Sequence, residues 1–531
     1  MKNFLFFLSL SVVSIAVAQN KKPDNWQTLD PAADNIMGTG AEEAYKTLAG
    51  KKAKTIIVAV IDSGTDPEHE DLKDIIWTNP GEIPGNNIDD DHNGYVDDVH
   101  GWNFLGGANG DIADEASELA RIYQRLSKKF ANVDTNHVPV ELQKDFAEFK
   151  KVSVKFRAEQ TEKQQDFYYM QVINSFIQKV KKDHGSFDKE SLSKFTPENA
   201  LESQLKKGLK IAFTLGMKPS DLEKEITDGY ESMKKSIALN TMNADSIRQA
   251  IVGDDLNNPN ERYYGNNHVQ GPEALHGTHV AGIIAAIRNN SKGINGIASN
   301  VKIMIVRAVP NGDERDKDIA NAIRYAVDNG ASVINMSFGK YYSPEKSVVD
   351  EAATYAQSKN VLIIHAAGNE SKNKDVEENY PSRKTMSGEV LTNWIEVGAN
   401  GYKKGKKVVA TFSNYGKINV DLFAPGVDIY STVPDNKYLI ESGTSMAAPC
   451  ATGVAALLLQ YFPELTPDQL RNVLIKTVVP YSHKVNVPGR TKKRIIKKLG
   501  TKPVRKKFSS LSVSGGFINA NRAAKELLKS K

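Results

Sequence analysis

The stretch KTIIVAVID at residues 54–62 is a nearly unbroken run of β-branched and apolar residues that ends on an acid. Such a run predicts a strand that is buried on both faces, as in a parallel sheet. Three later stretches have the same character: VKIMIVRAV at 301–309, ASVINMSF at 331–338 and VLIIHAAG at 361–368. Between them, DIANAIRYAVDNG at 318–330 has helical spacing and ends on a glycine. This alternation predicts an α/β fold with a doubly wound, mostly parallel sheet.

Residues 114–250 interrupt this alternation with a segment of different composition. The segment is rich in Lys, Glu, Gln and Phe at helical spacing and has no strand-like run. We therefore expect a helical insertion over 114–250, between the two parts of an α/β domain at 19–113 and 251–531. Both a functional lid and a solvated charged arm without a specific task fit this composition.

The composition excludes some classes of protein. A chain of 531 residues is long enough for one large core or two smaller ones. Its net charge of +5 does not match a dedicated nucleic-acid binder, and its one cysteine, Cys450, cannot form an intrachain disulfide. Ten Lys or Arg and no acid occur at 490–507, where we expect a flexible surface loop. Contact of this segment with a polyanion or a membrane surface is the alternative.

The N-terminal sequence MKNFLFFLSLSVVSIAVAQ has the three regions of a secretory signal peptide. Lys2 supplies the positive charge, residues 4–13 the apolar centre, and Ala16 and Ala18 the small residues before a cleavage site. We expect residues 1–18 to be removed and the chain to be exported, either to a periplasm or out of the cell. No other stretch of the sequence has the length and apolar character of a transmembrane span.

Four polar residues lie where the expected strands and helices begin or end. Asp62 ends a strand, His276 in HGTHVAG precedes a helix of small residues, Asn369 follows a strand, and Ser445 in SGTSMAAPC opens an apolar helix. Each has an ordinary structural alternative, such as a helix cap for Ser445 or a turn for Asn369. Together they supply a nucleophile, a base, an acid and an amide donor, which are the parts of a Ser-His-Asp mechanism.

The blocks VAVIDSGTD, HGTHVAG, VINMSFG, AAGNE and GTSMAAP, in this order, resemble the subtilisin-like serine proteases, or subtilases. The resemblance implies that Ser445 is the nucleophile, His276 the base, Asp62 the acid that orients it, and Asn369 an oxyanion donor. His276 is preferred over His279 because the family uses the first histidine of this block. A serine endopeptidase that cleaves peptide or protein substrates through an acyl-enzyme intermediate is therefore expected.

The resemblance also implies which residues hold the substrate. Residues 337–339 would pair with an extended peptide as an added strand. Residues 366–368 would form one wall of the pocket for the side chain before the scissile bond, with Gly312 at the opposite edge and Asn379 at the floor. The expected substrate contacts are Ser337, Phe338, Gly339, Ala366, Ala367, Gly368, Gly312 and Asn379.

Two places in the sequence are candidates for a structural calcium ion. Asp71 and Asn290 match positions that bind calcium in subtilisins, although the loop around Asn290 is one residue longer here. The stretch IDDDHNGYVDD at 88–98 has oxygen ligands at offsets like those of an EF-hand loop, but His100 stands where the bidentate glutamate would be. A solvated acidic turn is the alternative reading of this stretch. Its candidate ligands are Asp89, Asp91, Asn93, the Tyr95 carbonyl and Asp97.

Two other functions are weighed against an exported peptidase. A subtilase-fold binding protein without catalysis would lack one or more of the catalytic residue types, and all are present in this chain. A lipase or esterase with an α/β-hydrolase fold would carry its serine in G-x-S-x-G, whereas Ser445 lies in GTSMA.

Overall fold

The computed structural model describes residues 22–214, 216–493 and 501–529. These residues form two compact units. The larger unit comprises Lys22–Glu118 and the described part of Asp245–Lys531, and the smaller unit is Leu119–Ala244. The expected signal peptide at 1–18 lies outside the described residues.

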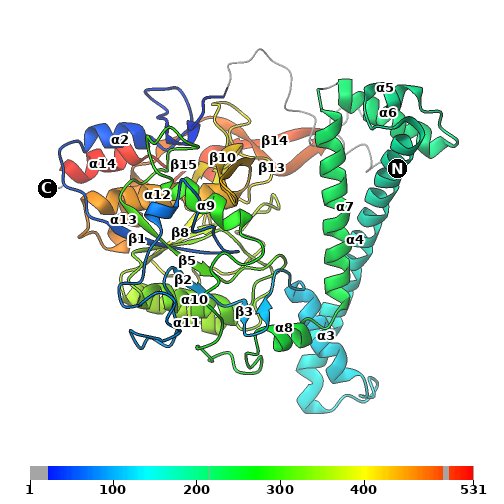
Figure 1. The fold of residues 1–531 in the computed structure, drawn as a ribbon, viewed down its shortest axis with the longest axis horizontal. Helices are drawn as coiled ribbons and strands as arrows, with labels where there is room; N and C mark the ends of the chain where they lie inside the picture. The colour runs from blue at the N-terminus through cyan, green and yellow to red at the C-terminus, as the bar shows by residue number, and fades with distance from the viewer. Residues whose placement is uncertain (1–21, 215, 494–500, 530–531) are drawn as a thin grey trace. The chain divides into compact units, whose positions relative to one another are not determined.

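A nine-stranded sheet organises the larger unit (Figure 1). Its strands pair in the order β12-β15-β9-β8-β7-β6-β1-β5-β2, and all neighbours are parallel except the antiparallel pair β12 and β15. The strand bounds are β1 Ile56–Asp62, β2 Gly101–Asn103, β5 Val301–Arg307, β6 Val333–Met336, β7 Leu362–Ala366, β8 Trp394–Asn400, β9 Leu422–Pro425, β12 Val479–Pro480 and β15 Gly516–Phe517.

Both faces of this sheet are covered by helices (Figure 1). On β1, Val58 and Val60 face one hydrophobic core, while Ala59 and Ile61 face the other. Helices α2, α9, α12, α13 and α14 pack in the first core, and α10 and α11 pack in the second. Their bounds are α2 Ala41–Thr47, α9 Leu275–Ala285, α10 Asp316–Asp328, α11 Lys346–Ser358, α12 Thr444–Tyr461, α13 Pro467–Lys476 and α14 Ala520–Lys529.

These layers confirm the predicted doubly wound α/β fold. The four apolar stretches form β1, β5, β6 and β7, and each lies inside its predicted range. They lack alternation because neither face of the sheet meets water, so apolar residues are favoured at every position.

The smaller elements of this unit are hairpins and short helices. The pairs β3–β4, β10–β11 and β13–β14 are antiparallel. Bounds are η1 Trp26–Thr28, η2 Lys73–Ile75, β3 Gly106–Gly107, β4 Gly110–Asp111, α8 Ala244–Ile251, β10 Ile429–Val433, β11 Lys437–Glu441, β13 Lys484–Lys493, β14 Thr501–Lys507 and η5 Phe508–Ser510.

The basic segment near the C-terminus forms part of a hairpin. Strands β13 and β14 pair antiparallel, and the apolar side chains of Val485 and Val487 are buried in a core with Phe423 and Phe508. The expectation of a flexible loop is therefore wrong for the paired residues, because alternate apolar positions anchor the strands. Residues 494–500 lie outside the described part.

The smaller unit is helical, and residues 119–214 and 216–244 contain no strand. Its helices are α3 Glu118–Phe130, which begins one residue before the unit, η3 Val140–Leu142, α4 Gln143–His184, α5 Lys189–Lys194, α6 Ala200–Thr214 and α7 Pro219–Thr241. Apolar residues of α4, α5, α6 and α7 share one small core, which includes Phe176, Leu209 and Ile226. No helix within the described ranges is long and apolar enough to cross a membrane.

Candidate active site

Three neighbouring strands bring the predicted residues to one edge of the sheet. Strands β6, β1 and β7 are parallel neighbours around β6, so their C-terminal ends lie side by side. Asp62 is the last residue of β1, Ser337 directly follows β6, and Asn369 lies three residues beyond β7. Helix α12, which carries Ser445 in its first turn, packs against all three strands. This edge is where α/β proteins bind their ligands.

Asp62 and His276 form the hydrogen-bonded pair that the triad requires. His276 Nδ1 donates to Asp62 Oδ1 over 2.7 Å, and the Ser63 backbone N–H donates to the same oxygen. The Asp62 side chain is 2% exposed, whereas that of His276 is 38% exposed. Burial opposes protonation of His276, but the Asp62 carboxylate outweighs it and raises the pKa of the imidazole. The pair therefore holds a base with one proton on Nδ1 and leaves Nε2 able to accept another.

Helix α9 approaches the end of β1 closely at Gly277. A Cβ on Gly277 would overlap the carbonyl oxygen of Gly64 and would lie 3.2 Å from the Cβ of Asp62. A glycine after His276 is therefore needed for the histidine to reach Asp62. This explains the glycine in the HGTH block in terms of packing.

Ser445 is the second residue of α12, and its hydroxyl does not cap the helix. The N-cap position is Gly443, and no side chain caps it. Ser445 Oγ donates instead to the Ser337 carbonyl over 3.0 Å, and Ser337 Oγ donates to the Ser445 carbonyl over 3.0 Å. The hydroxyl thus lies at the positive end of a helix and is free of a capping role.

Asn369 is oriented by the residue next to Ser445. Its Oδ1 accepts from the backbone N–H and the hydroxyl of Thr444, at 2.9 and 3.0 Å. The Nδ2 end of the amide therefore points away from these two Thr444 donors. Asn369 Nδ2 and Ser445 N both lie 3.5 Å from the place that a Cβ on Gly443 would occupy. Two N–H donors therefore border one small space, as an oxyanion site requires.

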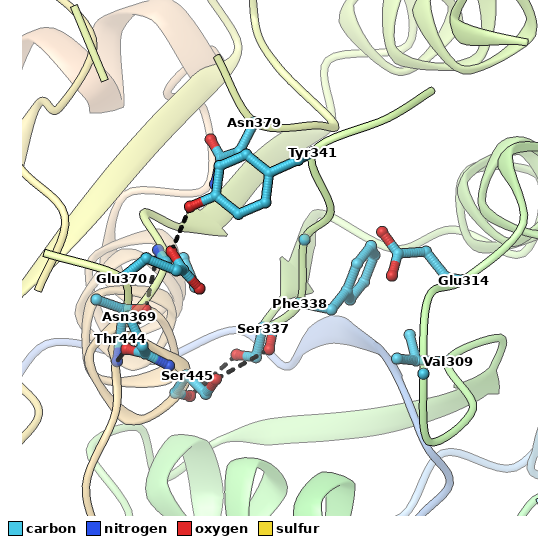
Figure 2. Close-up of a pocket in the computed structure, with 14 residues that line it drawn as sticks. Val309, Glu314, Ser337, Phe338, Tyr341, Asn369, Glu370, Asn379, Thr444 and Ser445 are labelled. Atoms are coloured by element: carbon cyan, nitrogen blue, oxygen red, sulfur yellow. Dashed lines mark hydrogen bonds between the residues drawn. The ribbon is translucent and has the colours of Figure 1, made fainter. Parts of the chain in front are cut away.

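A cavity of about 240 Å³ opens beside Ser445 (Figure 2). Seven of the eight predicted substrate contacts line it, and the exception is Ala367, whose carbonyl accepts from the Asn379 and Asn414 amides. Val309, Glu314, Tyr341, Glu370 and Thr444 line it without having been predicted as substrate contacts. The lining is Val309, Gly312, Glu314, Ser337, Phe338, Gly339, Tyr341, Ala366, Gly368, Asn369, Glu370, Asn379, Thr444 and Ser445.

Two glutamates are the charged residues of this lining. Burial raises the pKa of Glu314 to about 8, although the nearby Lys340 ammonium acts in the opposite direction. Glu370 is exposed, and its Oε2 accepts from the Tyr341 hydroxyl over 2.8 Å. Burial, together with this carboxylate, raises the pKa of Tyr341. At neutral pH the Tyr341 hydroxyl therefore remains a donor.

Among the buried histidines outside the cavity lining, His279 and His365 are the alternatives nearest in sequence to the candidate site residues. His279 Nε2 faces the carbonyls of Ile429 and Leu439, each at 3.2 Å, and burial lowers its pKa to about 4. His365 Nδ1 donates to the buried Glu396 carboxylate over 3.0 Å. Both have structural partners, which agrees with the preference for His276 as the base.

The structure brings Asp71 and Asn290 together. Asn290 Nδ2 donates to Asp71 Oδ1 over 2.6 Å, and burial raises the pKa of Asp71. A Cβ on Gly293 would lie 2.7 Å from the other Asp71 oxygen, so the loop packs tightly over this carboxylate. A buried carboxylate is the type of group that calcium binds, although the Asn290 amide turns its N–H and not its oxygen toward Asp71.

Two carboxylates of the acidic loop at 88–98 accept hydrogen bonds from backbone N–H groups. Asp89 accepts from the N–H groups of Asn93 and Gly94, and Asp97 accepts from those of Gly85 and Asn87. Tyr95 contributes its ring to a buried aromatic cluster. The structure therefore places Asp89 and Asp97 in turn-forming roles.

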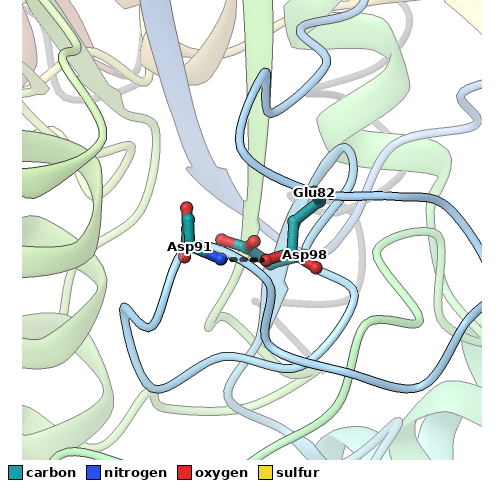
Figure 3. Close-up of side chains that lie close together, drawn as sticks. All are labelled: Glu82, Asp91 and Asp98. Atoms are coloured by element: carbon teal, nitrogen blue, oxygen red, sulfur yellow. Dashed lines mark hydrogen bonds between the residues drawn. The ribbon is translucent and has the colours of Figure 1, made fainter.

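Asp91 lies instead with Glu82 and Asp98 (Figure 3). Candidate ligand oxygens of these three residues lie within 4.8 Å of one another. Glu82 is 7% exposed and its Oε2 has no hydrogen-bond partner, while burial raises the pKa of Asp98 to about 6. Asn93 donates to both Asp91 and Asp98. Glu82 and Asp98 were missed because they do not follow the offsets of a known calcium loop.

The comparisons with known proteins agree with this fold. A family model described as the subtilase family matches residues 53–508, so the chain belongs to this family. It is 45% identical over 185 residues to the thermophilic serine proteinase of Bacillus sp. (strain AK1), and 41% identical over 184 residues to thermitase of Thermoactinomyces vulgaris. It is 34% identical over 268 residues to the cell wall-associated protease of Bacillus subtilis (strain 168).

These matches cover 34%, 34% and 49% of this chain. They cover 42%, 60% and 28% of the three relatives, so this chain spans less than two thirds of the length of each.

Proposed function

We propose that this subtilase is a serine endopeptidase that hydrolyses peptide bonds in peptide or protein substrates. The observation that carries the proposal is the Asp62–His276 hydrogen bond of 2.7 Å at the sheet edge to which Ser445 and Asn369 also belong. Membership of the subtilase family supports the same activity. The roles below are assigned to the residues of this chain on that basis.

In the first half of the reaction, Ser445 Oγ turns from the Ser337 carbonyl toward His276 and attacks the substrate carbonyl carbon. His276 Nε2 takes the hydroxyl proton, and Asp62 stabilises the imidazolium that forms. The negative charge on the former carbonyl oxygen is held by Asn369 Nδ2 and the Ser445 N–H. The C–N bond then breaks as His276 returns the proton to the leaving amine, which leaves an acyl group on Ser445.

In the second half, a water molecule takes the place of the amine. His276 removes a proton from the water, which attacks the acyl carbon, and the same oxyanion donors hold the second tetrahedral intermediate. The C–O bond to Ser445 breaks, Ser445 Oγ regains a proton from His276, and the carboxylic acid product leaves and gives its remaining proton to solvent.

We propose calcium as a structural ion for this protein. Asp71 and Asn290 would hold one ion, and Asp91, Glu82 and Asp98 would hold a second. Buried carboxylates without a paired cation destabilise the folded chain, and a bound cation would offset this cost of burial. The ion contributes stability and takes no part in the chemistry.

Export of the chain is also part of the proposal. The features of residues 1–18 support it, and so does the location in the printed name of the cell wall-associated relative. A periplasmic and an extracellular site both agree with these features.

Labelling with a fluorophosphonate and digestion of casein test the function. We expect the wild type to label at Ser445 and to cleave casein, and Ser445→Ala to do neither. Hydrolysis of lipid esters without peptide cleavage would favour a lipase, and a folded protein without either activity would favour the binding protein.

A further inference from the structure

Residues that line the cavity beside Ser445 lie on opposite sides of Phe338 (Figure 2). Tyr341, Asn379 and Glu370 lie on one side of the Phe338 ring, and Glu314 lies on the other. We call the side with Tyr341, Asn379 and Glu370 the first end, and Gly368 of the lining lies there, next to Glu370 and Asn379. The polar groups at this end determine which substrate side chain it can accept.

Asn379 presents an unused acceptor to this end. The residue is 4% exposed, and its Nδ2 donates to the Ala367 carbonyl over 3.2 Å. This bond sets the orientation of the amide, because a flipped amide would put its oxygen against the Ala367 oxygen. Asn379 Oδ1 is consequently buried without a donor. A buried acceptor without a partner leaves an uncompensated negative dipole, which favours a cationic side chain in the adjoining cavity.

Glu370 adds a negative charge next to Asn379. The place that a Cβ on Gly368 would occupy is 2.7 Å from Glu370 Oε2 and 3.2 Å from Asn379 Nδ2. Glu370 Oε2 accepts from the Tyr341 hydroxyl and the Asn414 amide, which hold it in this position. Within the described part of the chain Glu370 has no ion pair, and the cavity lining includes no Lys, Arg or His.

We infer that this end of the cavity selects a lysine or arginine side chain immediately before the scissile bond. The aliphatic stem of such a side chain lies along the cavity wall, and its cationic tip pairs with the exposed Glu370 carboxylate beside the unpaired Asn379 amide oxygen. The inference rests on the proposed peptidase function, and it adds the class of substrate.

Peptide pairs that differ only in lysine or norleucine before the scissile bond test the inference, because norleucine keeps the stem and removes the charge. In the wild type we expect kcat/KM to be at least tenfold higher for lysine. Glu370→Gln and Asn379→Leu should each lower this ratio at least threefold. Glu370 is exposed, so its variant is expected to fold even if Asn379→Leu is unstable. Equal or faster cleavage of the norleucine peptide by the wild type overturns the inference.

Two glutamine variants serve as controls, Glu314→Gln for a change elsewhere in the cavity and Glu351→Gln for loss of a surface charge. Glu314→Gln removes a carboxyl group from the same cavity on the other side of Phe338, and it should leave the lysine-to-norleucine ratio unchanged. Glu351→Gln removes an exposed carboxylate of α11, with a side chain 68% exposed, and should change neither the ratio nor the rate. An equal loss of preference in Glu314→Gln and Glu370→Gln would show that the preference does not depend on the end of the cavity that holds Glu370, and it would overturn the inference.

A binding measurement separates this inference from the proposed function. Peptides that end in lysine or norleucine are titrated into Ser445→Ala by calorimetry. We expect at least tenfold tighter binding of the lysine peptide, and this supports the pocket assignment even if the wild type cleaves no peptide. Equal affinities, or tighter binding of norleucine, contradict it whether or not peptides are cleaved.

Discussion

Ser445 and Ser337 exchange two hydrogen bonds, each 3.0 Å long, between the start of α12 and the end of β6. One bond holds the Ser445 hydroxyl on the Ser337 carbonyl, and the other ties the Ser337 hydroxyl to the Ser445 backbone. The nucleophile proposed here therefore rests on a strand end that is also expected to bind substrate. Substrate pairing at 337–339 would compete for the Ser337 carbonyl and release the hydroxyl toward His276.

Ser445→Ala should abolish peptide hydrolysis and keep the fold. Alanine removes the proposed nucleophile and leaves the small side chain that this half-buried position accepts, so we expect kcat/KM to fall by about 10⁴ or more. The melting temperature should remain close to that of the wild type. Ser337→Ala is the matched control, since it removes the bond to the Ser445 backbone and the acceptor of the Asn335 amide but keeps the nucleophile, and it should cost much less activity. Near-normal hydrolysis by pure Ser445→Ala would contradict the assignment.

The pH profile tests the Asp62–His276 pair. The Asp62 carboxylate raises the pKa of His276 above its ordinary value of 6.5, despite burial, and the base must be neutral to act. Activity should therefore fall on acidification with a midpoint above pH 6.5. Asp62→Asn removes the charge, so the midpoint should move to lower pH while the maximal rate falls by about 10⁴.

Glu441→Gln provides the control for this profile. Glu441 also acts to raise the pKa of His276, but it lies outside the triad. We expect a small shift of the acid midpoint to lower pH with little loss of the maximal rate. If Asp62→Asn keeps both the wild-type midpoint and the wild-type rate, the pair does not act as proposed.

Calcium should raise the melting temperature without changing the chemistry. An ion that binds only the folded chain stabilises it by about 2.7 kcal/mol when present at about 100 times its Kd. Asp71→Asn and Asp98→Asn should each remove part of the calcium-dependent increase, since they affect different proposed sites. Scanning calorimetry with excess calcium and with chelator measures this. Identical melting temperatures in the two conditions would exclude both sites.

The sequence predicts the sheet because its strands are buried on both faces. The uninterrupted apolar stretches that form β1 and β5–β7 could be located from composition alone. The hairpin β13–β14 could not, because only alternate residues such as Val485 and Val487 are apolar among many cations. Its strands are anchored by tertiary packing that no local pattern reveals.

Motif order located the residues of the candidate site, but spacing could not predict their partners. Asp62 and His276 are separated by 214 residues and meet through the parallel sheet and α9. Glu82 joins Asp91 and Asp98 through the path of a loop without regular structure, so no offset rule identifies it. Glu314 also lines the cavity from a loop, the one after β5, so its place there could not be predicted from sequence spacing.

The chain leaves the larger unit after Glu118 and returns to it at Asp245. One arginine of the larger unit, Arg315, binds residues near both of these points. Arg315 Nε donates to Glu115 Oε2, and Arg315 donates through a second nitrogen to Asp245 Oδ1, both over 2.9 Å. Glu115 lies before the helical unit and Asp245 lies after it. The loop that carries Arg315 also contributes Gly312 and Glu314 to the cavity. A short linker can therefore join Glu118 to Asp245 without moving this loop.

Replacement of residues 119–244 by a Gly/Ser linker tests whether the helical unit limits access to the site. A unit that limits access to the cavity excludes folded proteins more than short peptides. We therefore expect the ratio of folded-protein to small-peptide turnover to rise at least severalfold, with peptide turnover itself little changed. The linker variant with Ser445→Ala gives the background rate, and its melting curve reports folding. A soluble linker variant with an unchanged ratio would rule out the lid, and insoluble protein would instead assign the helices a role in folding.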